Sequence, residues 1–214
     1  MSVAVILSGC GAYDGSEIHE ATLTLLHLQK QGLAIQCYAP DHTFTPKNHL
    51  TQEIQPASRH ILTEAARIAR GNILPLTKVL DNDHNAAVFP GGFGAASHLC
   101  DFTDKGTQCT VLTEVKNLIT HYHAHKKPLG FICIAPILAA ALIPKVTLTI
   151  GTDPTTIEQL KTMGANPVPC FADQIAIDEK NLILSTPAYM LAKQITEVDQ
   201  GIEKLCHQLA QWIQ

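Results

Sequence analysis

Charged residues are scarce in this sequence. They make up 16% of the 214 residues, against 46% hydrophobic residues, which excludes a disordered chain and a charged coiled coil. Basic residues are not in excess either: 15 Lys and Arg stand against 19 Asp and Glu, for a net charge of −4. We therefore expect neither nucleic acid nor an anionic membrane as a partner.

The apolar run at the start of the chain is short. The run at the start, Val3 to Leu7, has no basic residue before it. It is shorter than the roughly 7–15 apolar residues of a signal peptide or the about 20 of a spanning helix. The seven cysteines include no C-x-x-C pair, which excludes zinc-finger and thioredoxin-type sites and is typical of thiols in a reducing compartment. We therefore expect a cytoplasmic protein.

A metal site is not expected at the three alternating histidines His121, His123 and His125. Residues two apart do not share a face of a helix, so three ligands would need an extended segment. Protonated histidines near a helix C-terminus explain the pattern better, because they are stabilised by the helix dipole. We expect no metal and no cofactor.

Short buried strands alternate with amphipathic helices along the chain, and the length indicates one domain over residues 1–214. The first helix is expected to start at the capping residues Asp14 to Glu17 and to end at Gly32, and residues 42–57 form a long excursion. Strands are predicted at 3–7, 33–38, 86–89, 129–132, 146–150, 174–177 and 182–185, and further helices at 59–69, 110–124, 135–142, 155–163 and 188–212. This order predicts an α/β three-layer sandwich around a mostly parallel sheet, with ligands at the carboxyl ends of the strands.

Two glycine-rich segments follow predicted strands. The segment 8–16 has the spacing G-x-G-x-x-x-G, one residue longer than a dinucleotide fingerprint, so a plain glycine turn is favoured over a nucleotide site. In the segment 90–94, the adjacent Gly91 and Gly92 expose backbone N–H groups that can form half of an oxyanion hole. The alternative for this second segment is a tight turn.

Cys133 stands at the end of the strand predicted over 129–132, directly before a helix. A nucleophile elbow has this strand-to-helix position and small neighbours. Ala135 is small, although Phe131 is not. The helix N-terminus is expected to lower the pKa of the thiol, and the alternative is a buried apolar cysteine.

Several longer motifs carry a resemblance to a known family: "ILSGCGAYDGSEIHEA", "VFPGGFGAA", "KPLGFICIAP", "TIGTDPTTIEQL" and "TPAYMLAKQI". They resemble the glyoxalase-like family of enhancing lycopene biosynthesis (ElbB) proteins, from residue 3 to about 205. That family is part of the PfpI and parkinsonism-protein superfamily, whose flavodoxin-like fold is shared with class I glutamine amidotransferases. The resemblance therefore implies a class I glutamine amidotransferase-like domain.

The resemblance also implies a role for each site residue. Cys133 matches the elbow cysteine, Glu17 the glutamate whose carboxyl meets it, and Gly92 and Ile134 the oxyanion-hole donors. We expect the first and fourth strands to be neighbours, which would bring Glu17 within hydrogen-bond reach of Cys133. Gly91 is a further positioning candidate.

One departure from the superfamily concerns the histidine of a Cys-His-acid triad. The two places where such a histidine often stands hold Ile134 and Asp153, so amidotransferase or protease activity is not expected. Asp153 precedes Pro154, which favours a helix N-cap over a substrate-positioning role.

The implied activity is that of a glutathione-independent glyoxalase, a lyase that converts glyoxal or methylglyoxal into a hydroxy acid through a cysteine hemithioacetal. A small aldehyde substrate and a homodimer are expected. Two alternatives stay open. One is a redox-sensing or regulatory cysteine protein, and the other is a non-catalytic small-molecule binding module linked to isoprenoid metabolism.

Overall fold

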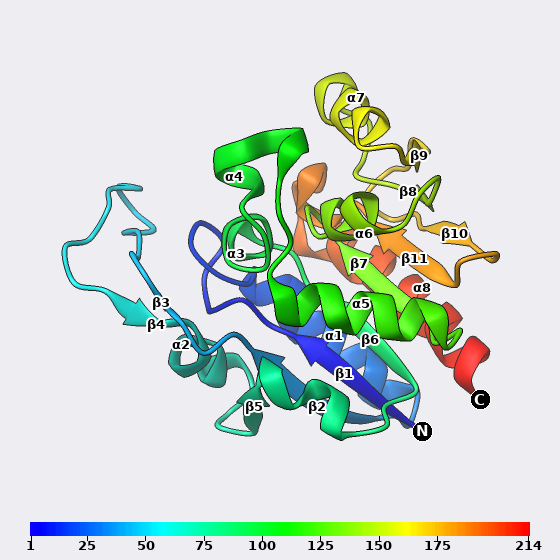
Figure 1. Ribbon diagram of the computed structural model, residues 1–214, viewed down its shortest axis with the longest axis horizontal. Helices are drawn as coiled ribbons and strands as arrows, with labels where there is room; N and C mark the ends of the chain where they lie inside the picture. Colours follow the sequence, from blue (N-terminus) through cyan, green and yellow to red (C-terminus); the bar gives the residue numbers. More distant parts are fainter.

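A seven-stranded sheet with the order β10-β11-β7-β6-β1-β2-β5 forms the centre of the computed structural model, which describes residues 1–214 (Figure 1). Its strands are β1 (Ser2–Ile6), β2 (Ala34–Ala39), β5 (Ile73–Pro75), β6 (Ala86–Phe89), β7 (Leu129–Ile132), β10 (Ala176–Asp178) and β11 (Ile183–Thr186). Only β10 is antiparallel to its neighbour. The mostly parallel sheet predicted from the sequence is confirmed.

The central strands are covered on both faces. Every residue of β6 and β7 is buried, and so are the last four of β1. Such strands consist of continuous apolar residues, without alternating polar ones. This composition made them visible in the sequence.

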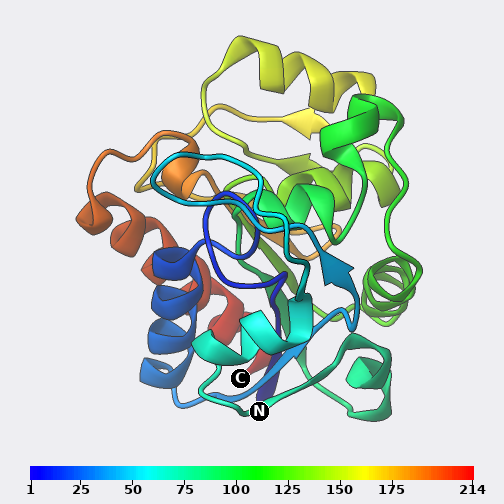
Figure 2. The same ribbon diagram turned by 90° about the vertical axis from the view of Figure 1, so that its left-hand side faces the viewer.

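Helices pack on both faces of the sheet, as Figure 2 shows, with α1 and α8 on one side and α5 on the other. One apolar core lies under α1 (Ile18–Lys30), α2 (Ile61–Ile68) and α8 (Ile195–Ile213). The second core lies under α3 (Phe93–Ser97), α5 (Thr113–Ala124), α6 (Pro136–Leu142) and the 3-10 helix η1 (Leu76–Asp81). The predicted three-layer α/β sandwich is therefore confirmed.

Several elements differ from the sequence prediction. The run 146–150 forms only the short β8 (Thr147–Leu148), which pairs with β9 (Asn166–Pro167) outside the main sheet. The excursion 42–57 includes β3 (Thr43–Phe44), whose partner β4 (Arg59–His60) takes the first two residues of a predicted helix. The last helix starts at Ile195, because a capping box between Gln194 and Glu197 begins it there. The short connecting helices are α4 (Phe102–Lys105), α7 (Pro154–Thr162), η2 (Gly106–Gln108) and η3 (Ala188–Met190).

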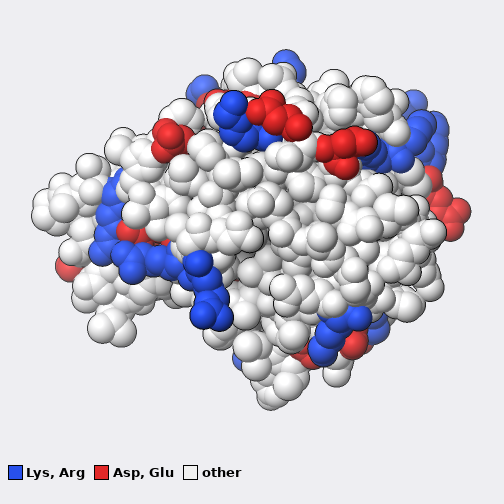
Figure 3. All heavy atoms as spheres, turned by 90° about the horizontal axis from the view of Figure 1, so that it is seen from below, with Lys and Arg blue, Asp and Glu red and all other residues white.

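The surface carries few charged side chains. On the face in Figure 3, basic and acidic residues lie near one another toward the edges, and a broad area between them is uncharged. The three alternating histidines lie at the C-terminal end of α5, where the rings of His121 and His125 stack with 4.1 Å between centroids. No group of three His, Cys, Asp or Glu side chains is arranged to hold a metal ion. No helix is both long and apolar enough to cross a membrane.

Candidate active site

The carboxyl ends of three adjacent strands, β1, β6 and β7, place the segments singled out in the sequence at one edge of the sheet. β6 pairs with β1 on one side and with β7 on the other. The expectation that the first and fourth strands are neighbours is therefore wrong, because the third strand lies between them. The loops after all three strands still meet, since parallel strands end at the same edge.

Cys133 occupies a strained turn directly after β7. Its φ is 62°, a left-handed conformation that costs energy for a residue with a side chain. Two backbone hydrogen bonds fix the turn: the Cys133 N–H donates to the Thr186 carbonyl at 2.9 Å, and the Ala135 N–H donates to the Ile132 carbonyl at 3.0 Å. This geometry is that of a nucleophile elbow.

Two backbone amides converge on the Cys133 sulfur. The N–H groups of Gly92 and Ile134, the two residues that the family resemblance assigns to an oxyanion hole, both donate to it. Gly92 has a φ of 94°, and a Cβ there would collide with the Gly15 carbonyl oxygen. Only glycine therefore allows this amide to approach the sulfur so closely.

The carboxyl that hydrogen-bonds Cys133 belongs to Glu20, one helical turn after the expected Glu17. Glu20 is fully buried, and its carboxyl accepts the N–H groups of Gly91 and Tyr189, each at 3.1 Å. Glu17 is instead the N-cap of α1, where its Oε2 accepts the Glu20 N–H at 2.8 Å. The sequence assignment of this contact to Glu17 is therefore wrong.

A sequence signal for Glu20 exists in the pattern of α1. The buried residues of this helix include Ala21, Thr24 and Leu28, which form one stripe along it, and Glu20 falls on that stripe. Glu17 lies outside the helix. A carboxyl on the buried face of a helix needs partners, and this requirement favours Glu20 over Glu17.

Burial controls the protonation of the pair. Burial, together with the nearby Glu17 carboxylate, raises the pKa of Glu20 to about 8, against the effect of the hydrogen bonds that its carboxyl accepts. Burial, together with the Glu20 carboxylate, also raises the pKa of Cys133, against the effect of the two amide donors. The lowered thiol pKa expected from the helix N-terminus is therefore wrong. The pair is neutral at pH 7 and loses its first proton near pH 8.

Gly91 leaves room for this pair. A Cβ at Gly91 would lie 2.5 Å from the Glu20 Oε2 and 2.9 Å from the Ile132 carbonyl oxygen, and it would collide with the Cys133 Cβ. A glycine here therefore allows the carboxyl and the sulfur to share one space.

Asp153 caps α7. Its Oδ2 accepts the Thr156 N–H at 2.8 Å and the Thr156 hydroxyl at 2.7 Å, and these bonds lower the pKa of the carboxyl. The side chain is exposed and does not line the cavity beside Cys133. The structure therefore confirms that Asp153 is a helix N-cap, as its position before Pro154 predicts.

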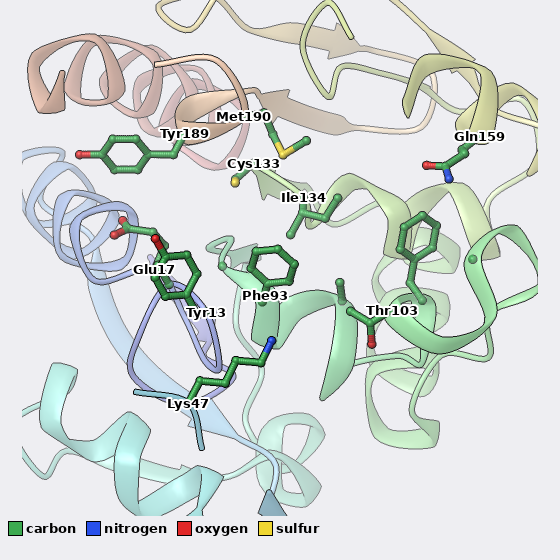
Figure 4. Close-up of a pocket in the computed structure, with 15 residues that line it drawn as sticks. Tyr13, Glu17, Lys47, Phe93, Thr103, Cys133, Ile134, Gln159, Tyr189 and Met190 are labelled. Atoms are coloured by element: carbon green, nitrogen blue, oxygen red, sulfur yellow. The ribbon is translucent and has the colours of Figure 1, made fainter. Parts of the chain in front are cut away.

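A cavity of about 820 Å³ opens beside Cys133 (Figure 4). No histidine is among its 15 lining residues, so the cysteine has no imidazole partner there. The lining comprises Ala12, Tyr13, Glu17, Lys47, Gly92, Phe93, Ala96, Phe102, Thr103, Gly106, Cys133, Ile134, Gln159, Tyr189 and Met190. Lys47 comes from the excursion 42–57 and Phe102 from α4, two segments without a sequence motif that indicates the site.

Comparison with known proteins identifies relatives along the whole chain, although no family model matches the sequence. The human "glutamine amidotransferase-like class 1 domain-containing protein 3, mitochondrial" is 40% identical over 94% of this chain and 79% of its own length. The rat "ES1 protein homolog, mitochondrial" is 39% identical with the same coverage. Both names contradict the cytoplasmic location expected from the sequence.

Two solved structures share the fold. One is an isoprenoid biosynthesis protein with an amidotransferase-like domain from Ehrlichia chaffeensis, with a TM-score of 0.92, 34% identity and coverage of 99% of this chain and 100% of that one. The other is DJ-1beta from Drosophila melanogaster, with a TM-score of 0.62, 16% identity and coverage of 98% and 91%. The second likeness concerns the fold alone.

Proposed function

Because the chain belongs to the family of the ES1 proteins and their glutamine amidotransferase-like class 1 relatives, we propose that it is an enzyme of the ElbB type, a glutathione-independent glyoxalase. The observation that carries the proposal is the buried pair of Cys133 and Glu20 beside two amide donors and an open cavity. A nucleophile, a proton carrier and an oxyanion site are the parts that this reaction needs.

The first step is addition of the Cys133 sulfur to the aldehyde carbon of a 2-oxoaldehyde. The thiol proton passes to the Glu20 carboxylate, which is present once the pair has lost one proton. The new oxyanion then lies where the N–H groups of Gly92 and Ile134 converge, and these donors stabilise it. Glu20 returns the proton to this oxyanion, which restores the carboxylate, and the product of the step is a neutral hemithioacetal.

Glu20 then moves a proton between the two substrate carbons. Its carboxylate removes the C–H proton of the hemithioacetal, and the resulting enediolate is protonated on the neighbouring carbon. The product is a thioester of a 2-hydroxy acid. Water hydrolyses the thioester, which releases the acid and restores the thiol, so the net change is the addition of one water to the oxoaldehyde. The pKa of about 8 suits Glu20 to both directions of transfer.

The test is formation of lactate from methylglyoxal without glutathione or added metal. Lactate is measured because free thiols also bind aldehydes without turnover. Wild type should form lactate, and Cys133→Ala and Glu20→Gln should each lose at least about a hundredfold in kcat/KM. Cys170→Ala, which removes a buried thiol outside the cavity lining, is the matched control and should keep its activity. No lactate from folded wild type would refute the proposal.

A redox-sensing cysteine is the second candidate, and the same converging donors favour it. The N–H groups of Gly92 and Ile134 would also stabilise an oxidised Cys133 sulfur carrying negative charge. The two functions are separated by peroxide treatment followed by mass spectrometry. A sensor gains oxygen mass at Cys133 at low peroxide and forms no lactate.

A further inference from the structure

The cavity beside Cys133 is much larger than a three-carbon aldehyde. Its volume of about 820 Å³ lies within the roughly 300–1,000 Å³ of pockets that enclose drug-sized ligands. Methylglyoxal would occupy only the part next to the sulfur. The remaining space is therefore available to a longer substrate.

The walls of this space are mainly apolar. Phe93, Phe102, Ile134 and Met190 line it, and Phe93 stands between Cys133 and Lys47 in Figure 4. Phe93 is 53% exposed, a large aromatic surface at the mouth of the cavity. A ligand with an apolar body would cover this ring and gain hydrophobic stabilisation.

Lys47 is the single basic residue of the lining. Its ammonium lies 5.8 Å from the centroid of the Phe93 ring, and it forms no ion pair with any carboxylate of the chain. Glu17, the one acidic residue of the lining, lies on the α1 side of the cavity (Figure 4). The charge distribution therefore favours an anion on the Lys47 side only.

The backbone under Lys47 is held in place, although the side chain belongs to the excursion 42–57. The Lys47 N–H donates to the Asp14 Oδ2 at 2.7 Å, and Asp14 is only 7% exposed. Lys47 also forms an isolated antiparallel bridge with Ile54, farther along the excursion. The ammonium is thus presented from a fixed point next to the loop after β1.

Resting on the proposed glyoxalase activity, we infer that the site takes 2-oxoaldehydes with an apolar body and an anionic group at the end away from the aldehyde. The aldehyde carbon meets the Cys133 sulfur, the body lies on Phe93, and the anion pairs with Lys47. The chemistry at the sulfur is that given above.

A matched pair of substrates tests this inference. Phenylglyoxal and 4-carboxyphenylglyoxal differ only by one carboxylate, and the mandelate products are measured. At low salt, wild type should prefer the carboxylate by about threefold to fivefold in kcat/KM, as expected for a partly exposed ion pair, and added salt should weaken the preference. Lys47→Met should abolish the preference, whereas Lys47→Arg should keep it. Lys116→Met, an exposed lysine of α5 without an ion pair, is the control.

A binding measurement separates this inference from the glyoxalase proposal. Acetophenone and 4-acetylbenzoate lack the aldehyde, so calorimetry with them requires no chemistry. Tighter binding of 4-acetylbenzoate that is lost in Lys47→Met, without turnover of any aldehyde, would support the anion site and overturn the glyoxalase. Turnover without any preference for the carboxylate, or with a preference that persists in Lys47→Met, would overturn the anion site alone.

Discussion

The Glu20 carboxyl is unfavourable in a protein interior, and its hydrogen bond with Cys133 offsets part of that cost. Glu20 also accepts two backbone N–H groups, from Gly91 and Tyr189, which links α1 to the loops after β6 and β11. The buried carboxyl depends on three partners from three different segments, so the loss of any one of them would lower the free energy of unfolding. Its protonation state therefore controls both the chemistry and the local structure.

The pH dependence of activity follows from this pair. The neutral pair cannot add to an aldehyde until it loses one proton, and the pKa of Glu20 is about 8. We predict that kcat/KM is low at pH 6, rises about tenfold for each pH unit below 8 and levels off above it. Alkylation of Cys133 by iodoacetamide, followed by mass spectrometry, should rise over the same range. A value of kcat/KM that is already maximal at pH 6 would contradict the requirement that the Cys133–Glu20 pair loses one proton before the reaction.

Glu17 and Glu20 can be told apart by their amide variants. Glu20→Gln should lose at least about a hundredfold in kcat/KM at every pH, since it removes the proton carrier. Glu17→Gln should keep activity within about tenfold, but the midpoint of its pH profile should move to lower pH, because the Glu17 carboxylate raises the pKa of Glu20. A pH profile for both variants is the measurement. Unchanged activity in Glu20→Gln would return the catalytic role to Glu17.

The site could be predicted from the sequence only where it is local. Cys133, Gly92 and Ile134 stand in short motifs at strand ends, and their geometry depends on a few neighbouring residues. The choice between Glu17 and Glu20 depends on how α1 is rotated against the sheet, which is a property of tertiary packing. The contribution of Lys47 depends on a contact of the excursion with Asp14, which no local pattern indicates.

Among the elements, prediction succeeded for strands buried on both faces. The runs that form β1, β6 and β7 are almost entirely apolar, and the strands predicted at 174–177 and 182–185 form the antiparallel pair β10 and β11. Prediction from the sequence was wrong where a short segment pairs with a strand outside the main sheet. The run 146–150 is largely buried like a central strand, but it lies against β9, and the edge strand β5 is only three residues long.

Asp153, the N-cap of α7, is expected to affect the stability of the protein but not its activity. Asp153→Asn should leave both nearly unchanged, because asparagine caps a helix about as well as aspartate. Asp153→Ala should lower the free energy of unfolding by about 1 kcal/mol and leave turnover of methylglyoxal intact. Denaturant unfolding and lactate formation measure the two quantities. A more than tenfold loss of activity in a folded Asn variant would instead indicate substrate positioning.

For the whole molecule, the raised pKa of Glu20 makes stability fall as the pH rises. In the unfolded chain Glu20 ionises near 4.5, whereas in the folded protein it stays protonated up to about 8. Between these values the folded protein binds more protons at Glu20, so the contribution of Glu20 to stability is greatest below pH 4.5 and declines until about pH 8. A rise from 4.5 to about 8 corresponds to roughly 5 kcal/mol as an upper value.

Glu20→Gln removes this dependence. We predict that the variant gains free energy of unfolding over wild type as the pH rises from 5 to 8.5, by up to a few kcal/mol, while losing activity. Urea unfolding of both proteins across this range measures the difference, and Glu53→Gln, an exposed glutamate, is the control. One transition is expected, since we propose that residues 1–214 form one domain. A constant difference across this range would mean that Glu20 is ionised when buried.

The homodimer stays a prediction from the family resemblance. Sedimentation of the pure protein at micromolar concentration should give twice the mass of the chain. A sedimenting species of the single-chain mass would contradict it. The strongly exposed Leu50 and Ile54, at the tip of the excursion, offer positions for charged substitutions that would weaken an interface there.

The excursion 42–57 also separates substrate choice from the catalytic framework. The reacting groups lie on the buried strand ends, where every change disturbs the core, as Gly91 and Gly92 illustrate. The residue we assign to substrate choice, Lys47, lies on a peripheral segment that adds no strand to the seven-stranded sheet. Segments of different length and charge could therefore be exchanged at this position, so that substrate range evolves, or is engineered, while the catalytic framework stays intact.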